Sequence, residues 1–525
     1  KNMIIFVKHM RNYIFCFLSA LLLSVSWPVA GFSYFIFFAF VPLLFVLKDF
    51  EKNYEKAGGQ VFWLSFLTFL IFNILTTYWV YYATLFGAIM AFLINSFLMS
   101  FVFYLFHKSK NVLGIRLGYL SLVIFWVSME YLHLNWDLSW PWLTLGNCFS
   151  ESLYLINWYE YTGVLGGSIW VLLTNILFFV FLNNFKIKKN LLVLAIVLFA
   201  PILASQVISK KYNETIIATK KIVIVQPNVD PYTDKFSLGY KQQLKDFVDL
   251  ARTKLDSTTD LLIGPETALL ESLWESKIEY SYSLKELEKL QRDFPKLNIL
   301  LGATTFKRFN SIDDISSTAR QIRTQDLWYD VYNSAIFISN LGKIDIYHKV
   351  KLVPGAEKIP FPFLLNNISS LSVNLGGVSG SLGSDNYLDV FSFDTLNLLP
   401  LICYESIFGD LNKSKDFDLM CIITNDGWWK NTSGYKQHFS YSKLRALEQR
   451  KSIIRCANTG QSGVINSRGE VIAFSDWNEK VAIDIEVSTN NIKTFYNKFG
   501  DYIGRISSFT SSIFLLLMFV KVKLK

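Results

Sequence analysis

The sequence predicts a polytopic α-helical membrane bundle with an α/β domain inserted before its last helix. Three observations predict this fold class. Apolar segments long enough to cross a bilayer crowd the first 210 residues and recur near the C-terminus. Lysines and arginines gather in alternate connections between these segments. Between about residues 220 and 490, short β-rich apolar runs alternate with helical stretches.

The membrane part follows from composition and segment length. The 525-residue chain has 16% aromatic residues and a mean hydropathy of +0.31, which do not fit a wholly soluble protein. A spanning helix needs about 20 mostly apolar residues. Eight spans are predicted, seven before the α/β domain and one after it, at 13–29, 33–47, 60–80, 82–106, 119–134, 165–182, 190–208 and 506–520. The predicted domains are therefore 1–210, 211–500 and 501–525.

Charge placement predicts the orientation of the spans, because short cytoplasmic loops carry an excess of Lys and Arg. The basic clusters are Lys1, Lys8 and Arg11; Lys48, Lys52 and Lys56; Lys108, Lys110 and Arg116; Lys186, Lys188 and Lys189; and Lys521, Lys523 and Lys525. The connections at 30–32, 81 and 135–164 have no basic residue. Both termini are therefore expected in the cytoplasm and residues 211–500 outside it. The net charge of +9 is mainly this topology signal, and no basic stripe indicates nucleic-acid binding.

The α/β domain places three polar residues at strand ends. Strands are expected at 221–226, 261–264, 299–303, 335–339, 399–403, 421–424, 453–456, 463–466 and 481–485, with helices at 240–255 and 437–451. Glu266, Lys349 and Cys403 each lie at or just past the end of an apolar, strand-like run. Because catalytic groups of α/β sheets gather at the carboxyl ends of strands, these are the predicted catalytic residues.

The chemistry of these residues suits acyl transfer through a thioester. A neighbouring base and a cation can activate the thiol of Cys403. Glu266 can take the thiol proton and later a proton from the incoming nucleophile. Lys349 can stabilise the oxyanion of the tetrahedral intermediate, with a backbone N–H near Tyr404 as a second donor. His348 should point to the opposite side of its strand from Lys349, which disfavours a papain-like pairing with the cysteine.

Several stretches carry a family resemblance. They are Gly264-Pro265-Glu266-Thr267-Ala268, Tyr347-His348-Lys349-Val350-Lys351-Leu352-Val353-Pro354-Gly355-Ala356-Glu357, Ile402-Cys403-Tyr404-Glu405, Thr424-Asn425-Asp426-Gly427-Trp428-Trp429, Gln437-His438-Phe439, Arg445-Ala446-Leu447-Glu448 and Asn458-Thr459-Gly460. These motifs resemble the nitrilase superfamily and, within it, the membrane-embedded apolipoprotein N-acyltransferases of bacterial inner membranes. The resemblance covers nearly the whole chain and implies a nitrilase-like sandwich for the inserted domain.

The resemblance also implies residue roles and a reaction. Glu266, Lys349 and Cys403 match the family's triad, and Glu357 and Glu405 match two further acidic residues that the family needs near the nucleophile. Such carboxylates can orient Lys349 and share in proton transfer. In the implied ping-pong reaction, the cysteine takes an acyl chain from a phospholipid, expected to be phosphatidylethanolamine, and passes it to the N-terminal amine of diacylglyceryl-cysteine apolipoproteins. The implied location is the bacterial inner (cytoplasmic) membrane, with the catalytic domain on the periplasmic side.

Tryptophans are the candidates for contact with lipid. Trp428 and Trp429 suit either the domain core or interfacial contact, and Trp142 is expected in an interfacial aromatic belt. The glycine-rich stretch 376–383 lacks the lysine of a phosphate loop. It is expected to be a flexible loop that could cover the site as a lid. Cys421 and Cys456 are expected in strand cores. No Cys-x-x-Cys or paired-histidine spacing predicts a metal, and no cofactor is expected.

Two other functions stay open on the sequence. A membrane-tethered amidase or nitrile hydrolase would use the same thioester chemistry with water as the final acceptor. The apolar bundle and the Trp-rich outer connections favour a lipid substrate over this alternative. A membrane scaffold with a degenerate catalytic domain is disfavoured by the intact set of Glu266, Lys349 and Cys403.

Overall fold

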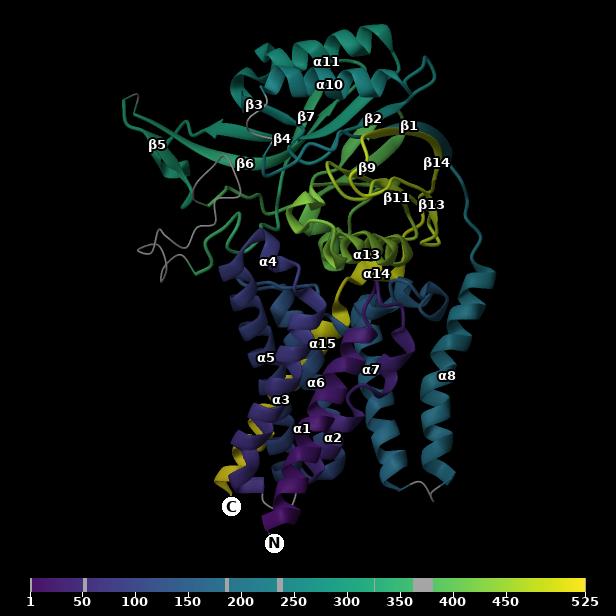
Figure 1. Ribbon diagram of the computed structural model, residues 1–525. Helices are drawn as coiled ribbons and strands as arrows, with labels where there is room; N and C mark the ends of the chain where they lie inside the picture. The colour runs from purple at the N-terminus through teal and green to yellow at the C-terminus, as the bar shows by residue number, and fades with distance from the viewer. Residues whose placement is uncertain are drawn as a thin grey trace. The chain divides into compact units, whose positions relative to one another are not determined.

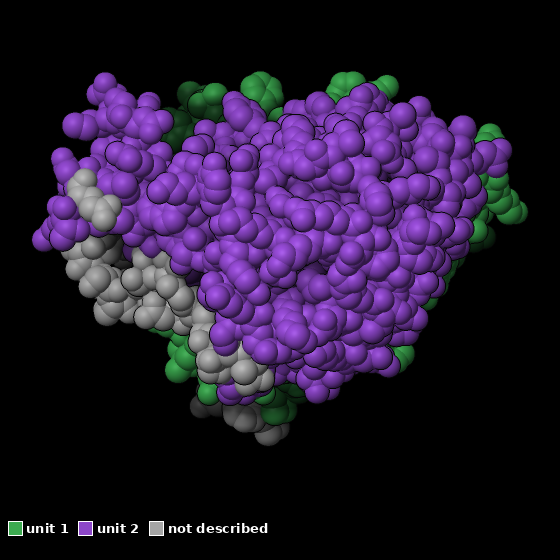
Figure 2. All heavy atoms as spheres, turned by 90° about the horizontal axis from the view of Figure 1, so that it is seen from above, with its two compact units in different colours: residues 1–212, 498–525 green, residues 213–497 purple. Residues whose placement is uncertain are grey.

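The chain folds into two compact units, one helical and one α/β (Figure 1). The computed structural model describes residues 2–50, 54–184, 188–233, 239–324, 326–361 and 381–524. Unit 1 comprises Lys1–Tyr212 and Lys498–Lys525, and unit 2 comprises Asn213–Asn497 (Figure 2). The α/β unit is thus inserted in sequence between the helices of unit 1.

Unit 1 is a bundle of apolar helices. Its helices are α1 (Asn2–Val25), α2 (Val41–Lys48), α3 (Tyr54–Thr77), α4 (Val80–Ala83), α5 (Leu85–Leu113), α6 (Ile115–Leu134), α7 (Tyr159–Asn183), α8 (Lys188–Lys211) and α15 (Tyr502–Lys523), with 3-10 helices η1 (Ser33–Phe38), η3 (Leu145–Phe149) and η4 (Leu153–Leu155). Among the described residues, six helices are long and apolar enough to cross a membrane: Ala57–Thr77, Leu85–Leu113, Ile115–Leu134, Tyr159–Asn183, Lys188–Lys211 and Tyr502–Lys523. The predicted helical region with several apolar helices is therefore confirmed.

The first two predicted spans correspond to shorter apolar helices, His9–Val25 and Ser33–Lys48. The second of them is interrupted between η1 and α2. Asn175 of α7 binds the backbone at this interruption, donating to the carbonyl oxygen of Ile36 at 2.7 Å and accepting from the N–H of Phe40 at 2.8 Å. Because the side chain satisfies backbone groups that the break has freed, the interrupted helix is tolerated in an apolar bundle. The total of eight spans stays a prediction.

Unit 2 is built on two sheets. In the part of the chain that the structure describes, the first sheet contains β1 (Ala218–Gln226), β2 (Leu261–Ile263), β3 (Leu269–Trp274), β4 (Asn298–Arg308), β5 (Arg320–Ile322), β6 (Leu327–Ile338), β7 (Ile344–His348) and β14 (Val481–Thr489). The second contains β8 (Phe391–Phe393), β9 (Leu396–Ile402), β10 (Leu419–Thr424), β11 (Ser452–Ala457), β12 (Gly463–Ile465) and β13 (Val471–Phe474). The α-helices of the unit are α10 (Tyr240–Arg252), α11 (Tyr282–Asp293) and α13 (Ser433–Gln449), and the chain passes from unit 2 to unit 1 within α14 (Phe495–Phe499).

The order of the strands brings distant segments together. It is β14-β1-β2-β4-β6-β5 in the first sheet, with β3 beside β4 and β7 beside β6, and β13-β12-β11-β10-β9-β8 in the second. Strands β1, β2 and β4 run parallel, as do β9, β10 and β11. The carboxyl end of β2 therefore lies beside the ends of its parallel neighbours in the first sheet, and the carboxyl end of β9 lies beside those of its parallel neighbours in the second. The end of β7 lies beside β6.

The two sheets pack face to face, with helices on their outer faces (Figure 1). Strand β1 shows how the sequence produces these layers. Ile222 and Ile224 join the core between the sheets, while Val223 and Val225 face the layer of α10 and α11. Since successive strand residues point to opposite faces, a strand covered on both sides must be apolar throughout. The predicted α/β domain is confirmed, as a sandwich whose second sheet carries α13.

Candidate active site

Cys403 is the first residue after strand β9 and starts the short 3-10 helix η8 (Cys403–Ile407). Its backbone is left-handed, with a φ of 52°, a conformation that costs a non-glycine residue roughly 1–2 kcal/mol. The hydroxyl of Ser406 donates to the carbonyl oxygen of Cys403 at 2.7 Å and supports this turn. Cys421 and Cys456, in contrast, are fully buried within β10 and β11, as expected for residues of strand cores.

The structure brings Glu266, Lys349 and Cys403 together. Glu266 follows β2 and Lys349 follows β7, and Lys349 Nζ lies 3.5 Å from Glu266 Oε1. The charges of both residues act on the thiol of Cys403. The exposed fractions of the three residues are only 7%, 1% and 9%. Three residues from three separate strand ends therefore share one buried site.

A second carboxylate, Glu357, is the closer partner of Lys349. Lys349 Nζ lies 2.8 Å from Glu357 Oε1, compared with 3.5 Å from Glu266 Oε1. The other oxygen of Glu357 accepts the N–H of Val353 at 2.8 Å, which fixes the carboxylate within the loop that follows β7. Lys349 is therefore held mainly by Glu357, and its bond to Glu266 is the weaker of the two.

Asn333 of β6 links the two carboxylates. Its amide nitrogen donates to Glu266 Oε1 at 2.8 Å and to Glu357 Oε1 at 2.9 Å. The two N–H groups of an amide suit two acceptors. Asn333 is not among the residues predicted from the sequence. Its signal is an amide side chain in the middle of a long buried strand, where a polar group needs a hydrogen-bond partner.

Glu405 ties the cysteine turn to the lysine loop. It is fully buried and accepts hydrogen bonds from the hydroxyl of Tyr347 at 2.7 Å and from the N–H groups of Val350 at 2.6 Å, Lys351 at 3.1 Å and Ile402 at 2.8 Å. These donors flank both Lys349 and Cys403. Burial raises the pKa of the Glu405 carboxyl, and the hydrogen bonds oppose that rise. The contacts of Glu405 suit the orienting part of its expected role.

The charges of the site follow from burial and from its neighbours. Burial raises the pKa of the Cys403 thiol, Glu266 adds to the rise, and Lys349 opposes it. Burial alone would lower the pKa of Lys349, but Glu357 and Glu266 together raise it above its usual value. At rest the cysteine is therefore a neutral thiol and the lysine a cation. Attack by the sulfur requires a base that removes the thiol proton.

His348 points away from these residues, as the alternation of strand side chains requires. Its Nε2 lies 2.7 Å from Glu275 Oε1, and its Nδ1 lies 3.0 Å from Asp385 Oδ2. The ring of Tyr332 stacks on the imidazole with centroids 3.9 Å apart. Burial alone would lower the pKa of His348, but the two carboxylates raise it to about 9. His348 is thus a buried cation that fixes the strand end before Lys349.

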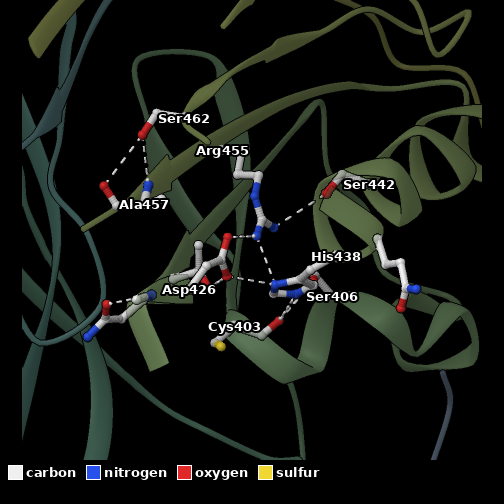
Figure 3. A network of polar contacts seen from close by, with 12 residues as sticks. Cys403, Ser406, Asp426, His438, Ser442, Arg455, Ala457 and Ser462 are labelled. Carbon is white, nitrogen blue, oxygen red and sulfur yellow. Dashed lines mark hydrogen bonds and ion pairs between the residues drawn. The ribbon is translucent and has the colours of Figure 1, made fainter. Parts of the chain in front are cut away.

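A buried network of Asp426, His438 and Arg455 lies next to Cys403 (Figure 3). His438 Nε2 lies 3.2 Å from the carbonyl oxygen of Cys403, while His438 Nδ1 lies 2.9 Å from Asp426 Oδ1 and 2.8 Å from Arg455 Nη2. Arg455 Nη2 also pairs with Asp426 Oδ2 at 2.7 Å. The sequence motifs included Asp426 and His438 without giving either a role. The signal for Arg455 is a basic residue inside the fully buried strand β11.

The same residues raise the question of a metal. The ligand atoms of Cys403, Asp426 and His438 lie within 4.8 Å of one another. The guanidinium of Arg455, however, already bonds to both Asp426 and His438. A divalent cation would have to lie beside this buried positive charge, which Coulomb repulsion in a low-dielectric interior opposes. The donor set therefore suits an internal ion pair and does not fit a metal.

Trp428 and Trp429 are half-buried near this network. The ring of Trp428 packs edge-on against Tyr232, with centroids 5.5 Å apart. The ring of Trp429 packs against the imidazole of His438, with centroids 5.4 Å apart. Both tryptophans therefore keep part of their surface accessible while being anchored to the domain, and their contact with lipid stays a prediction.

The other expected contacts lie in different surroundings. Trp142 is 2% exposed, and its ring packs against Trp79 within unit 1 with centroids 4.9 Å apart. The ring is therefore packed against another tryptophan of the same unit, and its contact with lipid stays a prediction. Tyr404 is buried against Phe408, and its backbone role as an oxyanion donor stays a prediction. Of the stretch 376–383, residues 376–380 lie outside the described residues.

Comparison with known proteins identifies the family. Residues 224–495, half of the chain, match the carbon-nitrogen hydrolase family, and residues 19–177 match the apolipoprotein N-acyltransferase N-terminal domain. A relative from Chlorobaculum tepidum named apolipoprotein N-acyltransferase is 27% identical over 522 residues, which cover 96% of each chain. Relatives of that name from Geobacter metallireducens and Thermotoga maritima are 27% and 25% identical, covering 94% and 95% of this chain and 92% and 93% of theirs. The chain therefore belongs to the carbon-nitrogen hydrolase family, or nitrilase superfamily, and within it to the apolipoprotein N-acyltransferases.

Proposed function

We propose that this enzyme moves an acyl chain from a membrane phospholipid, through a thioester on Cys403, to the N-terminal amine of diacylglyceryl-cysteine apolipoproteins. The observation that carries the proposal is the buried cluster of Glu266, Lys349 and Cys403. This cluster supplies a base, a cation and a nucleophile at one place, which is what acyl transfer needs. The apolar helices of unit 1 support a donor that lives in the membrane.

In the first half-reaction, the sulfur of Cys403 attacks the carbonyl carbon of a phospholipid ester. Because the resting group is a thiol, Glu266 takes its proton as the S–C bond forms. Lys349, held by Glu357, stabilises the negative charge that develops on the carbonyl oxygen. The tetrahedral intermediate then breaks its C–O bond to the glycerol, and Glu266 gives the proton to the leaving alkoxide. The products are the acyl-enzyme and a lysophospholipid.

In the second half-reaction, the α-amine of the diacylglyceryl-cysteine attacks the thioester carbon. Glu266 accepts a proton from the nitrogen as the C–N bond forms. The C–S bond breaks, and the proton returns to the sulfur of Cys403. An amide is made and the thiol is regenerated, so the two substrates react in turn in a ping-pong cycle.

The membrane arrangement is part of the proposal. Eight spans place both termini in the cytoplasm and residues 211–500 on the periplasmic face of the bacterial inner membrane, with domains 1–210, 211–500 and 501–525. The alternation of basic residues supports this orientation. The donor, expected to be phosphatidylethanolamine, reaches the site from the membrane, because moving an acyl chain into water costs about 0.8 kcal/mol per methylene group.

Intact-mass spectrometry tests the function. The purified full-length enzyme is mixed with phosphatidylethanolamine vesicles, without acyl-CoA or ATP, and should gain the mass of one acyl group. A Cys403→Ala variant is the matched control and should gain none. Added diacylglyceryl-cysteine peptide should then return the enzyme to its starting mass and gain the acyl group itself. Release of free fatty acid with unmodified peptide would favour the membrane-tethered hydrolase, and acylation of the Ala variant would overturn the role of Cys403.

A further inference from the structure

The left-handed turn at Cys403 is supported through its backbone carbonyl. Its carbonyl oxygen accepts from the hydroxyl of Ser406 at 2.7 Å and lies 3.2 Å from His438 Nε2. Figure 3 shows the carbonyl oxygen directed toward His438 and the sulfur directed to another side. Because the peptide unit is rigid and planar, a bond to its oxygen fixes the backbone from which the sulfur projects.

The contact from His438 is one of two that a single face of helix α13 makes with η8. His438 and Arg445 are seven residues apart, about two helical turns, so their side chains lie on the same face. Arg445 Nη1 donates to the carbonyl oxygen of Ile407, the last residue of η8. One long helix therefore holds both ends of the short 3-10 helix that begins with Cys403.

His438 is itself held from behind by an ion pair. Burial, and then the charge of Arg455, lowers the pKa of His438, so the imidazole is neutral. Burial alone would raise the pKa of Asp426, but Arg455 and His438 lower it, so this carboxylate is ionised. The pair places a donor, Arg455 Nη2, and an acceptor, Asp426 Oδ1, on the same nitrogen of the ring, Nδ1.

The contacts favour the tautomer with its proton on Nε2. Nε2–H then donates to the carbonyl oxygen of Cys403, and Nδ1 accepts from Arg455 Nη2. With the proton on Nδ1 instead, two acceptors would face each other at 3.2 Å and two donors at 2.8 Å. That second tautomer would keep the 2.9 Å contact from Nδ1 to Asp426 Oδ1, and its Nε2 could accept the hydroxyl of Ser406 at 3.0 Å. The hydroxyl of Ser406 would then no longer donate to the carbonyl oxygen of Cys403. The first tautomer therefore keeps three hydrogen bonds, from Arg455, from Nε2–H and from the Ser406 hydroxyl, and the second keeps two.

We propose that His438 is a positioning residue for Cys403. Its Nε2–H bond to the Cys403 carbonyl oxygen holds the strained turn that directs the sulfur toward Glu266 and Lys349. Asp426 and Arg455 fix the ring in the orientation that makes this bond. The inference rests on the proposed thioester function and adds a requirement to it, since the direction of the nucleophile depends on a residue outside the catalytic set.

Two near-isosteric replacements of His438 test the role. A glutamine side chain places an amide N–H near the position of Nε2, and an asparagine side chain places one near that of Nδ1. His438→Gln should therefore keep most of the acylation rate, while His438→Asn should lose about 100-fold, the typical effect of misplacing a reacting group by about 1 Å. The loss should fall on the maximal rate and leave the half-saturating ester concentration unchanged, because His438 bonds to the backbone of the nucleophile.

The burst of p-nitrophenol from a short-chain p-nitrophenyl ester measures this rate, since it reports on Cys403 whatever the natural donor is. A normal burst in an enzyme that phospholipid does not acylate would overturn the proposed function alone. Leu444→Ala is the matched control, because Leu444 is a fully buried residue of the same helix. Equal bursts in the Gln and Asn variants would overturn the positioning role. The positioning role would also be overturned if Leu444→Ala and His438→Asn had the same melting temperature and lost the burst rate to the same extent.

Ser406 provides a second pair of variants, which decides the matter if His438→Asn does not fold. The hydroxyl of Ser406 bonds to the same carbonyl oxygen as His438. Ser406→Ala should lower the maximal burst rate about fivefold, the effect of one lost hydrogen bond, whereas Ser406→Thr keeps a hydroxyl and should retain the rate. A burst in Ser406→Ala equal to that of the parent would overturn the view that bonds to this carbonyl hold the turn.

Discussion

The pairing of His348 with two carboxylates should make the stability of unit 2 depend on pH. Burial alone would lower the pKa of His348, but Asp385 and Glu275 raise it to about 9 in the folded protein, against about 6.5 in an unfolded chain. A raised folded pKa means that the folded state holds the proton more tightly than the unfolded state. The stabilisation is therefore fully present below about pH 6.5 and is lost as the pH rises through about 9.

The size of the effect follows from the pKa difference and the exposure of the partners. A difference of about 2.5 pKa units, at about 1.36 kcal/mol each, gives an upper bound of about 3 kcal/mol. The side chain of Asp385 is 39% exposed and that of Glu275 is 16% exposed, so solvent screens part of the first interaction. About 2 kcal/mol is left. The melting temperature of the unit should therefore fall by roughly 5 °C between about pH 6.5 and 9.5.

Thermal unfolding of the purified protein in detergent, followed by tryptophan fluorescence, measures this fall. His348→Gln keeps hydrogen-bonding groups but cannot take a proton, so it should lack the His348 contribution, and Glu275→Gln should lose part of it. Burial lowers the pKa of Lys451 to about 8, which makes stability rise with pH in the upper part of the range. The His348 effect is therefore read from the difference between variant and parent. If the melting temperatures of His348→Gln and of the parent changed with pH in the same way, the contribution of His348 to stability would be refuted.

Four changes probe the rest of the enzyme. Glu266→Gln should slow both acylation and transfer by roughly 10²–10⁴-fold, and a normal rate of thioester formation would exclude Glu266 as the base. Lys349→Met should lower the acylation rate by roughly 10²–10³-fold in a protein that still unfolds cooperatively, and an unchanged rate would remove its oxyanion role. Glu405→Ala leaves a buried hydroxyl and three N–H groups without their acceptor. It should therefore lower the free energy of unfolding by about 3 kcal/mol or more, and Glu405→Gln should lower it by less. Equal losses of stability in the two variants would contradict the role of Glu405 as a shared acceptor. A reporter active only outside the cytoplasm should be on when fused after Ser209 and off when fused after Lys186, and the reverse would place unit 2 in the cytoplasm.

The residues at strand ends could be predicted because their signal is local. An apolar run that ends in Glu266, Lys349 or Cys403 is visible in a short window of sequence, and a sheet with parallel strands gathers such ends. The residues next to Asn333 in the sequence give no comparable signal. Its partners are set by the antiparallel pairing of β6 with β7, which places it beside Lys349. The role of Asn333 therefore depends on register, which the pattern of a single strand does not give.

The helical unit shows the same division between local and distant signals. Hydropathy located the apolar helices because each one is a continuous apolar segment. It missed the break between η1 and α2, since the side chain that satisfies the freed backbone belongs to Asn175, 135 residues further along the chain from Phe40.

The neighbouring positions of β1 and β14 bear on how the enzyme is made. These strands lie at the two ends of unit 2 in sequence, and Ala218 pairs with Thr489 across a separation of 271 residues. Pairing over such a distance forms late, because a long loop must close first. During synthesis one edge of β1 therefore stays unpaired until β14 has been made. An unpaired strand edge can form hydrogen bonds with a strand of another chain. A newly made chain stays vulnerable to aggregation and to proteases until β14 has emerged, so the last strand of the domain completes its biogenesis.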